Sequence, residues 1–125
     1  MSSQFALVIE DERDEAFFFA QALQAAGLET EIIQAGDRAL ARLAVVVPDV
    51  VVLDLRLPRI AGTDILRQIR GDARLAETRV IVVTGDPQMA ESLRDEADLV
   101  LIKPIGFDQL RDLAARLVSI APPGK

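Results

Sequence analysis

Short apolar runs recur along the chain and predict the strands of a buried sheet. Four of these runs consist mostly of β-branched residues or leucine and end at a polar residue; they cover residues 6–9, 50–53, 80–83 and 99–102. Their apolar character is continuous rather than alternating, which indicates strands that are buried on both faces, as in a parallel sheet covered by helices. A weaker run at 30–34, flanked by glutamate, predicts an edge strand.

Amphipathic segments separate these runs and predict helices. Apolar side chains recur at helical spacing in residues 14–26, 37–44, 63–69, 87–96 and 107–120. Gly27 stands where a glycine ends the first helix, and Asp86 before Pro87 is typical of an N-cap followed by proline. Strand and helix therefore alternate, which predicts an α/β fold: a doubly wound, five-stranded parallel sheet with helices on both faces.

The length and composition fit one domain. The chain has 125 residues, of which 50% are hydrophobic, and this is enough for a substantial core. We expect a single domain over residues 1–125, with a core at about 5–120 and a tail or linker start at 121–125. Nothing after Ile120 is expected to fold, because Pro122, Pro123 and Gly124 end the last helical pattern.

Missing residue types exclude several kinds of chemistry. The chain contains neither cysteine nor histidine, which excludes disulfides, thiolate nucleophiles and histidine bases. The formal net charge of −6 argues against direct binding to nucleic acid. The start of the chain lacks the positive charge of a secretory signal, and Pro48 and Asp49 interrupt the longest apolar stretch. We therefore expect a cytoplasmic protein with no membrane partner.

Polar residues follow the predicted strands directly. Glu10 and Asp11 follow the first strand, Asp54 the third, Thr84 the fourth and Lys103 the fifth. Ligands of open parallel sheets lie outside the carboxyl ends of the strands, so these side chains are expected to converge there. Converging carboxylates need a compensating cation, and Mg²⁺ prefers oxygen ligands. An aspartate beside Mg²⁺ can attack phosphorus and form an aspartyl phosphate.

These motifs, in this order, resemble the receiver domain of response regulators, the phosphoacceptor module of two-component signalling. The resemblance extends from Leu7 to about Val118. Its motifs are the pair Glu10–Asp11, residues 48–54 followed by Leu57–Pro58 and Gly62, Thr84 at its strand end, and Lys103–Pro104. The resemblance implies a flavodoxin-like sheet with the strand order 2-1-3-4-5.

The resemblance also implies a role for each matching residue. Asp54 is the expected phosphoacceptor, Thr84 the switch hydroxyl and Lys103 the lysine that bridges to the phosphoryl group. The expected ligands of Mg²⁺ are Glu10, Asp11, Asp54 and the backbone carbonyl of Arg56. The peptide bond before Pro104 is expected to be cis.

Three positions depart from the family pattern, of which Glu10, where the family more often has aspartate, is a minor one. Val100 stands where the family usually has tyrosine or phenylalanine, so the usual aromatic movement cannot accompany that of Thr84. The switch is then expected to rely on the loop at Gly85 and on the helix that follows it. The long cationic side chain of Arg56 is expected to pair with Glu10 or Asp86, and to replace part of the magnesium charge when the metal is absent.

Some of these residues also have purely structural interpretations. Asp11 and Glu12 can cap the first helix through its dipole. Phe18 and Phe19 fit the apolar stripe of that helix, whereas Phe17 is expected to be partly exposed. Phe17 is then either a rim contact with a neighbouring side chain or a docking point for a partner.

The resemblance implies a phosphorylatable receiver that changes conformation. The phosphoryl group would come from a phosphohistidine of a histidine kinase or a histidine phosphotransfer protein, because the chain has no histidine of its own. The receiver would catalyse its own phosphorylation and dephosphorylation, and would act on an unknown downstream protein. We expect a stand-alone regulator, a phosphorelay intermediate or an isolated receiver. A homodimer is compatible with each of these.

Two alternatives differ in class from this interpretation. Val100 and Arg56 leave room for a receiver-like interaction module that works without phosphorylation. A flavodoxin-like cofactor binder is disfavoured, because acidic residues rather than a glycine-rich loop follow the first strand.

Overall fold

Strands and helices alternate through residues 4–119, which a computed structural model of the chain describes. The elements are β1 (Phe5–Ile9), α1 (Arg13–Ala25), β2 (Glu29–Ile33), α2 (Gly36–Leu43), β3 (Val50–Asp54), α3 (Gly62–Arg70), a short 3-10 helix (Ala73–Leu75), β4 (Arg79–Thr84), α4 (Pro87–Ser92), β5 (Leu99–Ile102) and α5 (Phe107–Ser119). The predicted alternation is confirmed. The expected end of the last helix at Ile120 and the expected tail lie outside the described residues.

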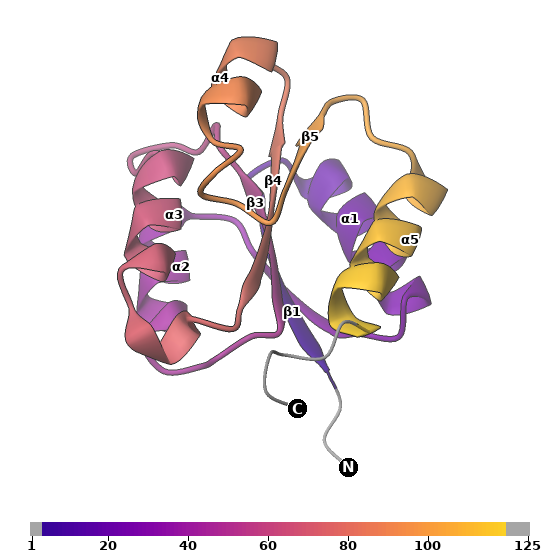
Figure 1. Cartoon of the computed structure of the whole chain (residues 1–125), viewed down its shortest axis with the longest axis horizontal. Helices are drawn as coiled ribbons and strands as arrows, with labels where there is room; N and C mark the ends of the chain where they lie inside the picture. The colour runs from indigo at the N-terminus through magenta and orange to yellow at the C-terminus, as the bar shows by residue number, and fades with distance from the viewer. Residues whose placement is uncertain (1–3, 120–125) are drawn as a thin grey trace.

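The five strands form one sheet in the order β2-β1-β3-β4-β5. All four neighbouring pairs are parallel. Helices α1 and α5 cover one face of this sheet, and α2 and α3 lie together on the other face (Figure 1). The fold class and the strand order predicted from the sequence are therefore confirmed.

Side chains of each central strand alternate between two cores. In β1, Ala6 and Val8 face the core beneath α1 and α5, whereas Leu7 and Ile9 face the core beneath α2 and α3. All four are fully buried, which explains why the run is continuously apolar. The alternation also decides on which face of the sheet a polar residue at the end of a strand emerges.

Capping interactions define where the helices begin and end. The Glu12 carboxylate caps α1 by accepting hydrogen bonds from the backbone N–H groups of Asp14 and Glu15. Gly27 follows the end of α1 with a φ of +96°, a conformation that glycine adopts without strain. Asp86 caps α4, with Pro87 at the first helical position. The structural interpretation of Glu12 and the predicted roles of Gly27 and Asp86 are confirmed.

Helix α4 is shorter than the prediction of residues 87–96. Beyond Ser92 the backbone continues in turns, because the Leu93 N–H bonds to the carbonyl of Ala90 and the Glu96 N–H to that of Leu93. Leu93 is buried, so these turns fold it onto the core before β5 begins. Within the described residues, no helix has both the length and the apolar character needed to cross a membrane.

Candidate functional site

Two buried carboxylates lie at the carboxyl edge of the sheet. Glu10 directly follows β1 and Asp54 ends β3, and they are 1% and 4% exposed. The strands β1 and β3 are neighbours, with Ile9 beside Leu53 in the register. Side-chain alternation places both carboxylates on the face that α1 and α5 cover, as it does Val8 and Val52. Adjacent strands therefore bring two acidic groups together at a point where water is largely excluded.

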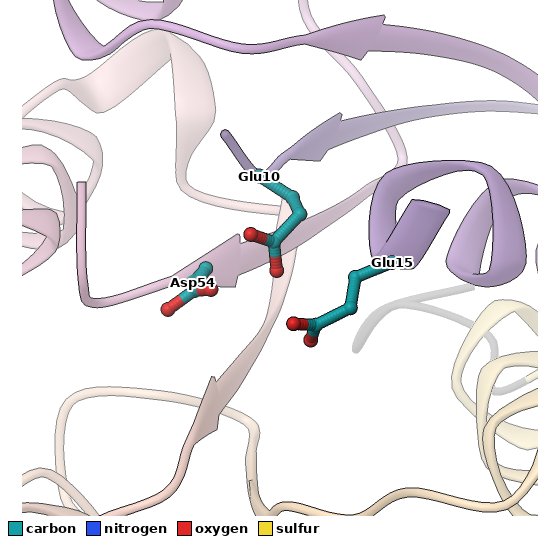
Figure 2. Close-up of side chains that lie close together, drawn as sticks. All are labelled: Glu10, Glu15 and Asp54. Atoms are coloured by element: carbon teal, nitrogen blue, oxygen red, sulfur yellow. The ribbon is translucent and has the colours of Figure 1, made fainter. Parts of the chain in front are cut away.

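Helix α1 contributes a third carboxylate to the same site. Glu12 caps this helix, so Glu15 falls in its first turn. Oxygens of Glu10, Glu15 and Asp54 all lie within 4.8 Å of one another. Figure 2 shows the three side chains pointing toward one another from β1, α1 and β3. We call these three residues the acidic cluster.

Lys103 compensates the charge of the acidic cluster. It follows β5, and its ammonium nitrogen Nζ lies 2.7 Å from Glu15 Oε1, 2.9 Å from Asp54 Oδ2 and 3.6 Å from Glu10 Oε1. The Lys103 side chain is only 26% exposed. The expectation that strand ends bring Glu10, Asp54 and Lys103 together is borne out by these distances.

The two buried carboxyl groups have pKa values that move in opposite directions. Burial and, to a smaller extent, the neighbouring Asp54 together raise the pKa of Glu10 to about 8. Burial also acts to raise the pKa of Asp54, but interactions with Glu10, the Arg56 N–H and Lys103 outweigh it and hold that pKa below its usual value. These opposite shifts favour the protonated form of Glu10 and the ionised form of Asp54.

The loop after β3 holds the second oxygen of Asp54. The Arg56 backbone N–H donates to Asp54 Oδ1 at 2.8 Å, while Oδ2 faces Lys103. A Cβ atom at Gly62 would lie 2.7 Å from the carbonyl oxygen of Asp54 and 2.5 Å from Leu55 Cα. Gly62 thus lets α3 begin directly against the backbone that carries Asp54.

The Arg56 side chain does not pair as expected. It is exposed, and within residues 4–119 it forms no ion pair with Glu10 or Asp86. The carboxylate of Asp86 instead caps α4, and Lys103 supplies the cation beside Glu10. The expectation that Arg56 stands in for magnesium charge is therefore without support in the geometry.

The remaining predicted residues lie around the acidic cluster rather than in it. Asp11 is exposed and is not one of the three clustered carboxylates. The Thr84 hydroxyl accepts a hydrogen bond from the Asp86 N–H at 3.1 Å, on the side of the sheet that carries α4. The Lys103–Pro104 peptide bond is cis, as expected.

Val100 and Gly85 are the two remaining residues expected to take part in the switch. Val100 is partly buried against the core beneath α2 and α3. Gly85 is exposed, with open space where a side chain would be. Phe17 is 58% exposed, whereas Phe18 and Phe19 pack into the core beneath α1 and α5, as predicted.

Glu15 is a member of the cluster that the sequence did not indicate. Its only local sign is its place in the first turn after a strand that ends in acidic residues. That sign is weak, because acidic residues are common in the first turn of any helix. Only the packing of α1 over the sheet shows that Glu15 reaches Lys103.

An unpartnered buried oxygen shows that the site suits a cation. Glu10 Oε1 is fully buried and accepts no hydrogen bond from any described residue. An unsatisfied buried carboxylate oxygen is costly, and a cation with several oxygen ligands would satisfy it. The donor set consists entirely of carboxylate oxygens, which Mg²⁺ prefers.

Curated proteins with similar sequences include a transcriptional regulatory protein and a DNA-binding response regulator. The chain is 29% identical over 119 residues to the phosphate regulon transcriptional regulatory protein PhoB of Rhizobium meliloti, which matches 93% of this chain and 52% of PhoB. It is 30% identical over 114 residues to the DNA-binding response regulator MtrA of Mycobacterium tuberculosis strain H37Rv, covering 91% of this chain and 49% of MtrA. The chain thus spans about half the length of the curated relatives it matches.

Structural comparison points to the same family. The receiver domain (CheY-like) of a response regulator from Methylobacillus flagellatus superposes with a TM-score of 0.82 and 26% identity, covering 93% of this chain and 99% of that structure. The sequence profile described as "Response regulator receiver domain" matches residues 6–115. With its sheet order and the acidic cluster at the carboxyl edge, the chain therefore belongs to the response regulator receiver domain family.

Proposed function

We propose that this chain accepts a phosphoryl group on Asp54 from a phosphohistidine of a partner protein. The observation that carries the proposal is the state of Asp54 itself. It is an ionised carboxylate, 4% exposed, whose two oxygens are held by the Lys103 ammonium and the Arg56 N–H. A buried carboxylate held in this way is poised to act as a nucleophile.

The phosphoryl transfer needs positioning and charge compensation more than acid–base chemistry. An oxygen of Asp54 attacks phosphorus, the oxygen–phosphorus bond forms, and the phosphorus–nitrogen bond of the donor breaks. The bonding electron pair returns to the imidazole nitrogen of the partner. Lys103 offsets the charge of the incoming phosphoryl oxygens. Water later attacks the phosphorus and regenerates the Asp54 carboxylate.

The acidic cluster suits the magnesium ion that this transfer requires. A cluster of this kind is typical of the magnesium site of receiver domains. When bound, Mg²⁺ neutralises negative charge on the transferring group. We assign Glu10 and Asp54 as its principal ligands, with the Arg56 carbonyl, and with Asp11 as the nearby exposed carboxylate. The unpartnered Glu10 Oε1 supports this assignment.

Thr84 is the proposed link between phosphorylation and the α4 side of the molecule. Its hydroxyl holds the Asp86 N–H, and the Asp86 side chain caps α4. If the hydroxyl turns toward the phosphoryl group, this bond is lost and the loop at Gly85 is released. The partly buried Val100 packs on the same side, so the change would reach α4 without movement of an aromatic ring.

A partner carrying phosphohistidine must reach the carboxyl edge of the sheet. Receiver domains partner with histidine kinases, and both a kinase and a histidine phosphotransfer protein fit this role. Phe17 is the proposed docking residue, because it is 58% exposed and lines a groove of about 440 Å³ together with Ile32. Replacing Phe17 with alanine is expected to slow transfer from the cognate kinase and to leave phosphorylation by small donors unchanged. Equal kinase-dependent rates in the two proteins would remove Phe17 from the proposal.

The test of the proposal uses a small phosphodonor. Wild type, Asp54→Asn and Asp64→Asn are each incubated with acetyl phosphate, with and without Mg²⁺, and the mass of each protein is then measured by mass spectrometry. Asp64 is an exposed carboxylate on α3 and serves as the matched control. We expect wild type and Asp64→Asn to gain one phosphoryl group with Mg²⁺, and Asp54→Asn to gain none. Absence of any mass gain in wild type would contradict the proposal and favour an interaction module that works without phosphorylation.

A further inference from the structure

Glu15 makes the shortest contact of the Lys103 ammonium. The distance from Lys103 Nζ to Glu15 Oε1 is 2.7 Å, compared with 2.9 Å to Asp54 Oδ2. The two carboxylates approach from different elements, Glu15 from α1 and Asp54 from β3. The lysine that serves the phosphoacceptor is therefore already shared with a second carboxylate.

We propose that Glu15 is a positioning residue that holds Lys103 and competes with the phosphoryl group for its ammonium. The proposal rests on the proposed function, because it concerns the same Asp54 site. This competition has two consequences. A phosphoryl mimic at Asp54 binds less tightly than it would without the Glu15 charge, and the phosphorylated state has a shorter lifetime.

The charges around Lys103 change when Asp54 is phosphorylated. The Asp54 carboxylate becomes an acyl phosphate, and the anionic oxygens then belong to the phosphoryl group. Glu15 keeps its own negative charge, with an oxygen within 4.8 Å of an oxygen of Asp54 in the free protein. Like charges at such a separation repel, and they compete for the one cation between them.

The exposure of Glu15 limits the size of this effect. Its side chain is 40% exposed, compared with 5% for Asp54 and 1% for Glu10. Solvent therefore screens the Glu15 charge more than it screens the other two. We expect neutralisation of Glu15 to strengthen anion binding by about tenfold, which is one unit on a logarithmic scale of affinity.

The first experiment measures the affinity of beryllium trifluoride, a phosphoryl mimic, in the presence of Mg²⁺. Glu15→Gln removes the charge and keeps a hydrogen-bond acceptor for Lys103. Asp14→Asn removes the same charge from the neighbouring exposed position in the first turn of α1. We expect Glu15→Gln to bind the mimic about tenfold more tightly than wild type, and Asp14→Asn to bind it as wild type does.

The second experiment observes Lys103 in the free protein. The sequence contains lysine at positions 103 and 125 alone, so the two ammonium groups are readily distinguished by ¹⁵N NMR. The ion pair with Glu15 should slow the exchange of the Lys103 ammonium protons with water. Glu15→Gln should speed this exchange, whereas Asp14→Asn should leave it unchanged.

The two experiments separate failure of this inference from failure of the proposed function. Unchanged or weaker binding of the mimic by Glu15→Gln, when wild type binds it, would overturn the competition. Unchanged proton exchange in Glu15→Gln would overturn the Lys103–Glu15 contact itself. If wild type binds no mimic while the Asp54→Asn test also fails, the proposed function fails, and the competition fails with it.

Discussion

At the residue scale, the site is a set of acidic groups that share one ammonium group and one proton. Asp54 and Glu10 are both buried, and Lys103 lies within 4.0 Å of both. Two buried carboxylates of like charge are unfavourable together, so one of them retains its proton. Glu10 is that residue, because its burial, together with the neighbouring Asp54, raises its pKa, whereas the pKa of Asp54 is lowered.

This shared proton predicts how stability depends on pH. The pKa of Glu10 rises from an ordinary 4.5 to about 8 on folding, so the folded state binds more protons than the unfolded state between these values. Stability should therefore fall as pH rises through this window, and should level off above it. The Asp54 pKa is lowered instead, so its contribution is present above its ordinary value of 3.8 and is lost only at lower pH.

Glu10→Gln tests this dependence, because glutamine imitates the protonated side chain at every pH. In metal-free buffer, we expect wild type to lose on the order of 2 kcal/mol of unfolding free energy between pH 5 and pH 8. Glu10→Gln should lose much less. Urea denaturation at several pH values measures this, with the exposed Glu77→Gln as a control that should behave as wild type. Equal losses in Glu10→Gln and wild type would show that Glu10 is not the group that titrates.

At the element scale, the local pattern predicts strands better than helix ends. The five runs predicted as strands match the observed strands to within one residue at each end. They do so because burial on both faces leaves a continuous apolar run. The segment between α4 and β5, which was predicted to be helical as far as residue 96, is held instead by contacts far away in sequence. Asp98, just before β5, is held by Arg70 and Arg79 and accepts a hydrogen bond from the Val80 N–H, and no local pattern reveals these partners.

The junction between β3 and α3 predicts a strong effect of one methyl group. In Gly62→Ala, the added Cβ would lie 2.5 Å from Leu55 Cα and 2.7 Å from the Asp54 carbonyl oxygen. Backbone atoms cannot move aside as a flexible side chain can, so we expect a loss of about 2–3 kcal/mol of unfolding free energy. Displacement of the backbone at Asp54 and Leu55 should also weaken binding of the phosphoryl mimic at Asp54.

Gly85→Ala is the matched control for this prediction. Its added Cβ would meet no atom within 4 Å, and its φ lies outside the left-handed region. We expect its unfolding free energy to change by less than about 1 kcal/mol. Chemical denaturation of both variants gives the comparison. Similar stability of Gly62→Ala and Gly85→Ala would mean that the contact at Gly62 relaxes without cost.

At the scale of the whole molecule, the topology determines how much of the site the sequence reveals. The sequence predicts that Glu10, Asp54 and Lys103 meet, because parallel strands end at the same edge of the sheet and each of these residues lies at the carboxyl end of a strand. Glu15 was not predicted, because it reaches the site only through the packing of α1 over the sheet. Asp11 was predicted as a ligand, and it lies at the exposed surface next to the cluster.

Because the molecule carries a net negative charge, the effect of magnesium on its thermal stability has a non-specific and a site-specific part. A formal charge of −6 means that any salt stabilises the fold to some degree by screening repulsion. A specific site adds a further term, about 1.4 kcal/mol at a magnesium concentration ten times the Kd. For a domain of this size, that term corresponds to a rise in Tm of about 5 °C.

Scanning calorimetry is the appropriate measurement, because the chain has neither tryptophan nor tyrosine for fluorescence. Magnesium chloride should raise the Tm of wild type and Asp64→Asn by more than sodium chloride of equal ionic strength does. In Asp54→Asn and Glu10→Gln this difference should largely disappear, because each variant removes a carboxylate from the cluster that would hold the ion. An equal magnesium-specific rise in all four proteins would place the bound ion elsewhere on the acidic surface, and the buried oxygen of Glu10 would then need another partner.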